Sequence, residues 1–275
     1  MDIIAILARE LDVRPAQVQA AVQLIDEGNT IPFIARYRKE VTGSLNDEVL
    51  RNLYERLTYL RNLEDKKTQV LSTIEEQGKL TPELKAQIEK AQTLVAVEDL
   101  YRPYRPKRRT RATIAKEKGL EPLADLIRLQ MTQEPLEILA ADYISEEKGV
   151  ATADEALEGA GDILAERISD DAGYRTWIRK ITVAEGCLVS KAKDEKAASV
   201  YEMYYDFEEP VNKIAGHRIL AINRGEKEKF LTVRVEAPEE KILSWMKRQV
   251  ITRDNPQTSP MLERVVEDSY QRLIA

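Results

Sequence analysis

The stretch DEVLRNLYERLTYLRNLEDKKTQVLSTIEEQ, from Asp47 to Gln77, is the longest helical pattern in the chain. Leu50, Leu53, Leu57 and Leu60 recur at steps of three and four residues, and Val70, Leu71 and Ile74 resume the pattern after the charged stretch 64–67. This spacing places apolar side chains on one face of an α-helix. The 31 residues predict a helix of about 46 Å. The charged interruption favours an arm of a helical bundle, with a coiled-coil seam as the alternative.

Both ends of this stretch carry helix-boundary residues. Asn46 is a preferred N-cap, and Leu45 and Leu50 are spaced as a hydrophobic staple around it. Gly78 followed by the apolar Leu80 is typical of a C-terminal cap. We therefore expect the helix to begin at Asp47 and to end just before Gly78.

Capping residues and apolar periodicity predict further helices on both sides of the long one. Before it, we expect a short opening helix marked by Ile3, Ile4 and Leu7, a helix from Pro15 closed by Gly28, and the helix PFIARYRKEV, which starts at Pro32 and ends at Gly43. After it, we expect helices over about 82–91, 93–101, 111–118 and 122–130, then Ala153–Ile168, Ala172–Lys193, Ala197–Phe207, Glu239–Ile251 and Ser259–Ala275.

One segment, Phe230 to Val235, alternates like a half-buried strand. A strand needs a partner for its backbone groups, and Arg218 to Ile222 is the nearest candidate, although that segment fits a helix equally well. We therefore predict a mostly α fold: a multi-helix bundle with one long helix and a helix-turn-helix-like unit. It contains at most a short β strand or hairpin near 218–236.

The stop signals divide the chain into three predicted parts. Residues 1–77 form a helical part that contains the long helix, and residues 78–131 form the helix-turn-helix-like unit with a basic loop. Residues 132–275 form a helical part that packs back on 1–77. Helix-turn-helix geometry is also a common packing solution without DNA, so it does not by itself indicate nucleic-acid binding.

The amino-acid composition limits which classes of protein this chain can belong to. A hydrophobic fraction of 43% with 33% charged residues is typical of a folded chain in water. No apolar run has the length of a membrane span, and the first residues lack the features of a signal peptide. The single cysteine, Cys187, fits a reducing compartment and is predicted to be a buried structural thiol on a helix. We expect a cytoplasmic protein without membrane contact.

Positive charge is concentrated between Arg102 and Lys118. This segment contains eight Lys or Arg residues and one acidic residue, so its net charge is +7, whereas the whole chain has a net charge of −6. Clustered cations are the usual contacts for phosphate. The candidate nucleic-acid-binding residues are Arg102, Arg105, Lys107, Arg108, Arg109 and Arg111, with Arg36, Arg38 and Lys39 as weaker candidates. The alternative is that these cations pair with acidic helices of the same chain.

Three tyrosines lie among these basic residues. Tyr101 and Tyr104 flank the start of the basic segment, and Tyr37 lies between Arg36 and Arg38. Such rings stack on unpaired bases in single-stranded nucleic acid. For Tyr101 and Tyr104, packing beneath the turn is the favoured interpretation.

The sequence contains no catalytic pattern. His217 is the only histidine, and no serine lies in a nucleophile elbow. His217 is expected to lie at a helix start or to pack. One cysteine and one histidine cannot build a tetrahedral zinc site without several carboxylates, and glycine-rich phosphate-binding loops are absent. We expect no catalytic residues, no metal and no cofactor, and hence no enzyme.

Four segments carry a family resemblance: IDEGNTIPFIARYRKEVTGSL (Ile25–Leu45), EEQGKLT (Glu75–Thr81), EDLYRPYRPKRRTRATIAKEKGLEPLA (Glu98–Ala124) and HRILAINRGE (His217–Glu226). With these, the chain resembles the N-terminal region of the Tex family of bacterial transcription accessory proteins. The resemblance implies a helical region that precedes a YqgF-type RNase H-like domain, helix-hairpin-helix units and a C-terminal RNA-binding barrel. It also implies a relation to a eukaryotic transcription elongation factor.

The resemblance places the main nucleic-acid binding of the family in that C-terminal barrel. From it we expect a non-enzymatic module that contributes a basic surface to RNA or DNA binding, weakly in this part of the protein, or to binding of the transcription complex. The alternative is a docking scaffold that contacts RNA polymerase or other domains of the same protein and does not touch nucleic acid.

Overall fold

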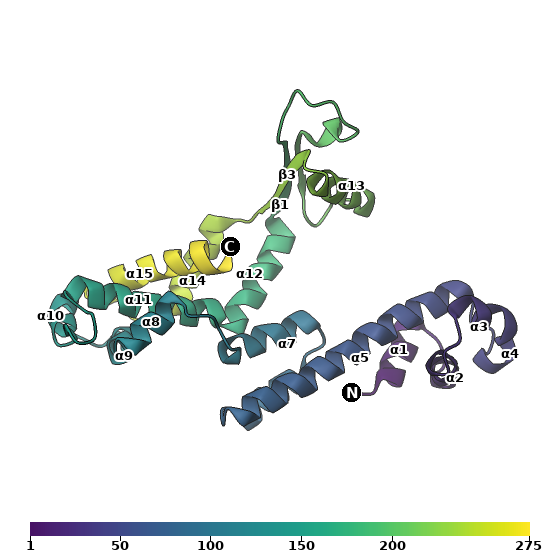
Figure 1. Cartoon of the computed structure of the whole chain (residues 1–275), viewed down its shortest axis with the longest axis horizontal. Coiled ribbons are helices and arrows are strands. Elements are labelled where there is room, and N and C mark those ends of the chain that lie inside the picture. Colours follow the sequence, from purple (N-terminus) through teal and green to yellow (C-terminus); the bar gives the residue numbers. More distant parts are fainter. The chain divides into compact units, whose positions relative to one another are not determined.

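The computed structural model describes all residues from 1 to 275 and divides them into two compact units, Met1–Tyr104 and Arg105–Ala275, called unit 1 and unit 2. Helices dominate both units (Figure 1), which confirms the predicted mostly α fold. No helix combines the length and apolar composition that crossing a membrane requires.

Unit 1 is built on one long helix, α5 (Asp47–Glu76). The helices packed against it are α1 (Ile3–Leu11), α2 (Pro15–Asp26), α3 (Ile31–Tyr37), α6 (Pro82–Lys90) and α7 (Leu94–Tyr101). The short α4 (Lys39–Thr42) packs on α2 and α3, and a 3₁₀ turn, η1 (Arg102–Tyr104), ends the unit.

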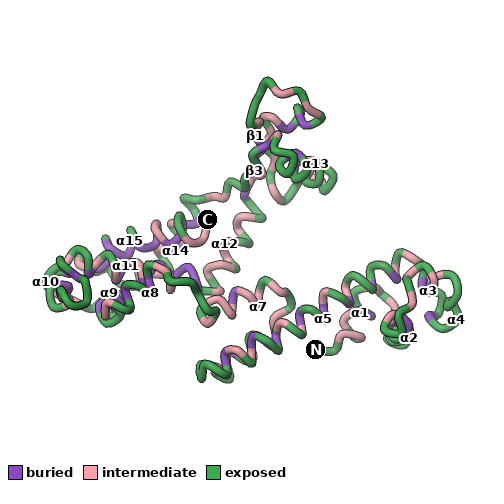
Figure 2. The backbone as a smooth tube through the Cα atoms, in the orientation of Figure 1, coloured by how far each residue is buried: buried purple, intermediate pink, exposed green.

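The predicted boundary residues of α5 are confirmed. Asn46 Oδ1 accepts a hydrogen bond of 2.8 Å from the Val49 N–H, and Leu45 and Leu50 are both buried. Gly78 has φ +67°, a left-handed conformation that glycine adopts without strain. The buried positions recur along α5 in Figure 2 and form the core of unit 1, so α5 is an arm of a bundle.

The predicted helix from Pro32 to Val41 is interrupted at Arg38. Arg38 has φ −130° and ψ 26°, and it separates α3 from α4. The carbonyl of Arg38 accepts hydrogen bonds from the backbone N–H and the hydroxyl of Thr42, which is fully buried. The turn lets Ile34 on α3 and Thr42 on α4 both face inward, a feature that helical periodicity does not reveal.

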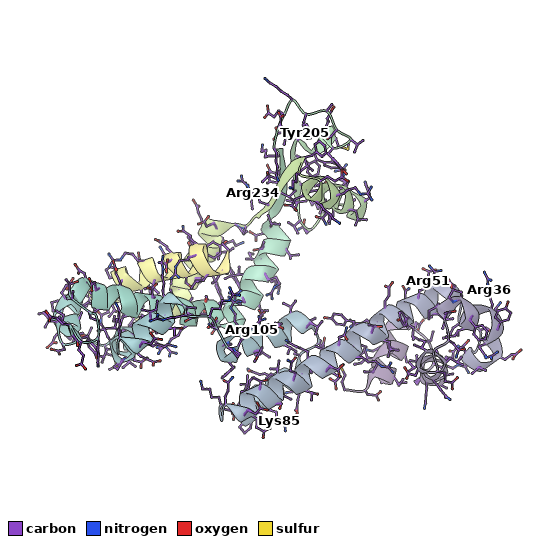
Figure 3. All side chains as sticks on the ribbon, in the orientation of Figure 1. Arg36, Arg51, Lys85, Arg105, Tyr205 and Arg234 are labelled. Carbon is purple, nitrogen blue, oxygen red and sulfur yellow. The ribbon has the colours of Figure 1, made fainter.

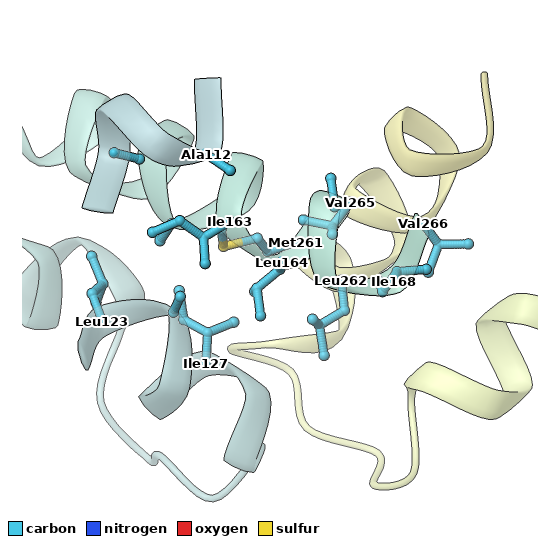
Figure 4. Packing of buried hydrophobic residues seen from close by; sticks show 14 of the residues in the cluster. Ala112, Leu123, Ile127, Ile163, Leu164, Ile168, Met261, Leu262, Val265 and Val266 are labelled. Atoms are coloured by element: carbon cyan, nitrogen blue, oxygen red, sulfur yellow. The ribbon is translucent and has the colours of Figure 1, made fainter. Parts of the chain in front are cut away.

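Unit 2 is organised around α11 (Ala153–Asp170), which contacts five other helices. These are α8 (Arg111–Glu117), α9 (Glu121–Leu129), α10 (Leu136–Ala141), α12 (Ala172–Glu185) and α15 (Ser259–Asp268), and α14 (Glu239–Val250) packs on α12 and α15. Figure 4 shows Ile163, Leu164 and Ile168 of α11 among the buried side chains of its neighbours. The predicted helix Ser259–Ala275 ends in a π-helical turn, η3 (Ser269–Ile274).

The β structure of unit 2 exceeds the prediction. Strands β1 (Cys187–Ala192), β2 (Asp206–Pro210) and β3 (Leu231–Glu236) form an antiparallel sheet in the order β2-β1-β3. The predicted strand Phe230–Val235 is confirmed, but its partner is β1. Arg218–Ile222 instead lies in helix α13 (Gly216–Lys227), which packs on β3.

One predicted helix is therefore too long, and another is wrong. Ala172–Lys193 ends as a helix at Glu185, and Ala197–Phe207 contains only a 3₁₀ turn, η2 (Glu202–Tyr204), before β2. At Gly186 an added Cβ would lie 2.4 Å from the Thr182 carbonyl oxygen, so the chain turns where only glycine fits. Leu188 and Val233, in this sheet, pack against the small core under α13.

The division between the units falls inside the segment 78–131. Its first two helices, α6 and α7, pack on α5, whereas α8 and α9 pack on α11. The segment thus contributes one helix pair to each core, and its helix-turn-helix character stays a prediction.

Candidate nucleic-acid interface

The basic loop, Arg105–Thr110, begins unit 2 and leads into α8. Thr110 caps this helix, because its hydroxyl oxygen accepts a hydrogen bond of 3.1 Å from the Thr113 N–H. Pro106 lacks a backbone donor, which suits a segment outside helices and strands. One side of the loop faces α11 and is called the inward side, and the other faces solvent and is called the outward side. The cations on the two sides differ in whether they form ion pairs with acidic side chains.

Lys107 anchors the inward side of the loop to α11. Its ammonium group donates to Glu166 Oε1 at 2.9 Å and to the carboxylate of Asp170. The side chains of Glu166 and Asp170 are only 16% and 10% exposed. Because carboxylates this buried need a cation nearby, Lys107 has a structural role and is not a free phosphate ligand.

A row of acids on α11 explains this anchor. Asp154, Glu158, Asp162, Glu166 and Asp170 follow one another at four-residue steps, so each acid lies about one helical turn from the next along α11. Like charges at this spacing repel one another, so the row needs cations. This i, i+4 repeat of acids is visible in the sequence. For part of the basic segment it favours the alternative that the cations pair with an acidic helix of the same chain.

Arg111 and Arg272 supply positive charge near Asp162, in the middle of the acidic row. Arg272 donates to Asp162 at 3.0 Å and to Asp268 at 2.5 Å. Burial raises the pKa of Asp162, while the charges of Arg272 and Arg111 oppose that increase. The hydrogen bond from Arg272 lowers the pKa of Asp268. Arg111 therefore faces carboxylates of its own unit.

The outward side of the loop keeps its cations exposed. Arg108 is exposed and makes no ion pair. Arg109 pairs with Glu117 at 2.7 Å, but both side chains are more than half exposed, and such pairs contribute only about 0–1 kcal/mol. These two guanidinium groups are the part of the loop that is best placed to contact phosphate.

Arg102 and Arg105 differ in exposure. Arg102 is half-buried in η1, whereas Arg105, labelled in Figure 3, is exposed at the first position of the loop. Both make contacts within the protein.

The weaker candidates form a separate group in unit 1, the α3–α4 patch: Phe33, Arg36, Tyr37, Arg38 and Lys39. The three cations are exposed and make no ion pair with a carboxylate. The Arg38 guanidinium lies 5.0 Å from the centre of the Phe33 ring, and the Tyr37 side chain is 62% exposed. Arg36 lies toward the opposite end of unit 1 from Lys85 (Figure 3). The patch offers more unpaired charge than the inward side of the loop.

Tyr101 and Tyr104 pack against the core of unit 1. The ammonium group of Lys66 lies 5.6 Å from the centre of the Tyr101 ring, and Gln77 donates a hydrogen bond of 2.8 Å to the Tyr104 carbonyl. These contacts match the favoured packing interpretation.

His217 and Cys187 lie in the part of unit 2 that contains the sheet. His217 is exposed in the first turn of α13. Cys187 is half-buried on strand β1, so its predicted position on a helix is wrong. Desolvation, followed by the hydrogen bond and charge of Glu208, raises the pKa of the Cys187 thiol, which disfavours the reactive thiolate. No group of three or more His, Cys, Asp or Glu side chains is arranged to hold a metal ion.

Comparison with known proteins gives two family matches. Residues 1–75 match the model of the Tex-like protein N-terminal domain, and residues 130–269 match that of the Tex central region. The chain is 46% identical over 271 residues to the uncharacterized protein YdcI of Bacillus subtilis (strain 168), a match that covers 98% of this chain and 38% of YdcI.

Two further relatives carry more descriptive names. The transcriptional accessory protein Tex of Neisseria gonorrhoeae is 45% identical over 85% of this chain and 31% of its own length. The human S1 RNA-binding domain-containing protein 1 is 28% identical over 99% of this chain and 29% of its own length. The chain thus spans about a third of the length of these relatives.

Proposed function

The chain belongs to the Tex family, and from this we propose that it is a non-enzymatic module that contributes a basic surface to nucleic-acid binding in transcription. The names of two relatives support this role, because one is a transcriptional accessory protein and the other carries an RNA-binding domain. In this proposal the module needs no cofactor, and it works in the cytoplasm beside RNA polymerase or other domains of the same protein.

The observation that carries the proposal is the two-sided basic loop. Lys107 and Thr110 hold the loop on α11, so Arg108 and Arg109 are presented outward from a fixed base. An anchored loop loses less conformational freedom on binding than a mobile one, which favours contact with phosphate. The α3–α4 patch is a second phosphate surface with an exposed aromatic ring, Tyr37.

The test is fluorescence anisotropy of labelled single-stranded RNA and duplex DNA titrated with the protein at several salt concentrations. We expect binding at low salt that the double charge reversal Arg108→Glu and Arg109→Glu weakens at least tenfold. The double variant Lys85→Glu and Lys90→Glu, at two exposed and unpaired cations of α6, changes the net charge by the same amount and is the control. Absence of binding at low salt, or equal affinity in the double variant and the control, contradicts the proposal.

A second candidate function is a docking scaffold without nucleic-acid contact. It is favoured by the outer surface of α13, where the Leu220 side chain is 72% exposed on a helix that also presents Arg224 and Lys227. Large exposed apolar side chains beside charged ones are typical of protein-binding surfaces.

A pull-down distinguishes the two functions. If α13 docks, Leu220→Asp should abolish association with RNA polymerase or with the remaining two thirds of the Neisseria gonorrhoeae relative, while nucleic-acid affinity stays unchanged. Association that survives Leu220→Asp and Arg224→Glu contradicts docking through this helix.

A further inference from the structure

A pocket of about 380 Å³ lies in unit 2 where the C-terminal ends of α9 and α14 meet α11 and the start of α12. Its apolar side is formed by Leu164, Ile168, Val250 and Leu262. The volume is within the range of sites that hold small organic groups, about 300–1,000 Å³. An apolar surface with a few polar groups at its edge is the usual form of such a site.

Three polar side chains that line the pocket have no hydrogen-bond or ion-pair partner in the protein: Arg128, the hydroxyl of Tyr174 and the amide of Gln249. Burial and the charge of Asp171, which also lines the pocket, raise the pKa of the Tyr174 hydroxyl, and the charge of Arg128 opposes that increase. By contrast, Arg167 on the same wall is held by Glu121 at 2.9 Å and Asp125 at 2.6 Å. The pocket therefore offers one available cation, one ring and one amide, beside the carboxylate of Asp171, which accepts a hydrogen bond from the Tyr174 backbone N–H.

The ring of Tyr174 is held in place by an aromatic cluster. Tyr174 meets Trp245 edge-on, with ring centres 5.6 Å apart and planes at 85°. Trp245 is stacked on Trp177 at 3.9 Å with nearly parallel planes. A ring that is already fixed loses little freedom when it stacks on a ligand.

The pocket and the basic loop are neighbours on α11. Lys107 is anchored to Asp170, the last residue of α11, and Asp171, the next residue, lines the pocket. The residue that holds the loop and a residue that lines the pocket are thus consecutive in the chain.

We propose that the pocket receives one unstacked base of a single-stranded nucleic acid whose phosphates contact the basic loop. Tyr174 provides the stacking surface, Gln249 hydrogen-bonds the edge of the base, and Arg128 contacts an adjacent phosphate. The inference rests on the proposed nucleic-acid binding and narrows it to single strands, because a base paired in a duplex does not expose its faces.

The experiment compares a labelled single strand of mixed sequence, as RNA and as DNA, with the same strand annealed to its complement. We expect Tyr174→Leu and Gln249→Ala each to weaken single-strand binding, the first roughly tenfold, and to leave duplex binding unchanged. Tyr143→Leu is the matched control, since Tyr143 packs on the same core without lining the pocket. The chain's two tryptophans are Trp177 and Trp245, so single strands should also quench its tryptophan fluorescence.

The outcomes separate this inference from the proposed function. If the loop variants weaken binding while Tyr174→Leu and Gln249→Ala do not, the pocket assignment is wrong and the loop proposal stands. Equal quenching by single strand and duplex also overturns the assignment. If neither nucleic acid binds at low salt, both proposals fail. A difference between the RNA and DNA arms identifies which single strand the pocket prefers.

Discussion

At the scale of single residues, neighbouring cations in the basic loop have different roles. Lys107 lies over two poorly exposed carboxylates, whereas Arg108 points to solvent without a partner. Composition predicts the cluster, but not this division, because the direction of each side chain depends on the position of α11 beneath the loop. The i, i+4 acids of α11 are the sequence feature that would have indicated where Lys107 and Arg111 pair.

This difference predicts unequal effects on stability. Lys107→Met should lower the free energy of unfolding by about 1–3 kcal/mol, because it removes the ammonium group that contacts both Glu166 and Asp170. Arg108→Met should change it by less than about 0.5 kcal/mol. Urea denaturation followed by circular dichroism measures both, and equal effects would contradict the assigned roles.

The ion pair between Asp268 and Arg272 also predicts a pH dependence. The pKa of Asp268 is lowered by Arg272, so this carboxylate stabilises the fold above its unfolded pKa of about 3.9, and the contribution is lost as the pH falls through the lower folded value. Arg272→Gln should therefore cost about 1 kcal/mol at pH 7, and less as the pH falls below about 4. Urea denaturation at both pH values is the measurement. If Arg272→Gln lowers the free energy of unfolding more in acid than at pH 7, the stabilising role assigned to this ion pair is wrong.

At the scale of elements, most helices follow from capping residues and periodicity, and the sheet does not. The long α5 was predictable because a cap, an apolar stripe and a terminal glycine agree on its bounds. Strand β1 follows α12 without a separating loop, and its pairing with β2 and β3 depends on residues far away in the sequence. Local patterns cannot reveal such pairing.

The different surroundings of two glycines on α11 predict opposite effects of alanine at these positions. A Cβ on Gly159 would lie 2.3 Å from the buried Leu120 Cδ1 and 3.3 Å from Ala115 Cβ, whereas a Cβ on Gly161 has no neighbour closer than 3.6 Å. Gly159→Ala should destabilise unit 2 by about 1 kcal/mol despite the helix propensity of alanine. Gly161→Ala should stabilise it by up to about 1 kcal/mol. Thermal unfolding of both variants tests this, and the same sign for both would refute it.

At the scale of the whole molecule, each unit has its own buried core. The core of unit 1 is drawn from α1 to α7, and the cores of unit 2 from residues after Arg105. Met1–Tyr104 and Arg105–Ala275, expressed separately, should therefore each show helical circular dichroism and a cooperative unfolding transition. A fragment that stays unfolded would contradict the division at Tyr104.

The central claim is that Arg108 and Arg109 contact phosphate, and the salt dependence of binding tests it most directly. Each phosphate contact to a single strand adds roughly 0.7 to the slope of log affinity against log salt. Replacing Arg108 and Arg109 by glutamine should therefore reduce the magnitude of that slope by about 1.4 for a labelled single strand between about 50 mM and 200 mM salt. Lys85→Gln should leave it unchanged, and an unaltered slope in the double variant would contradict the claim.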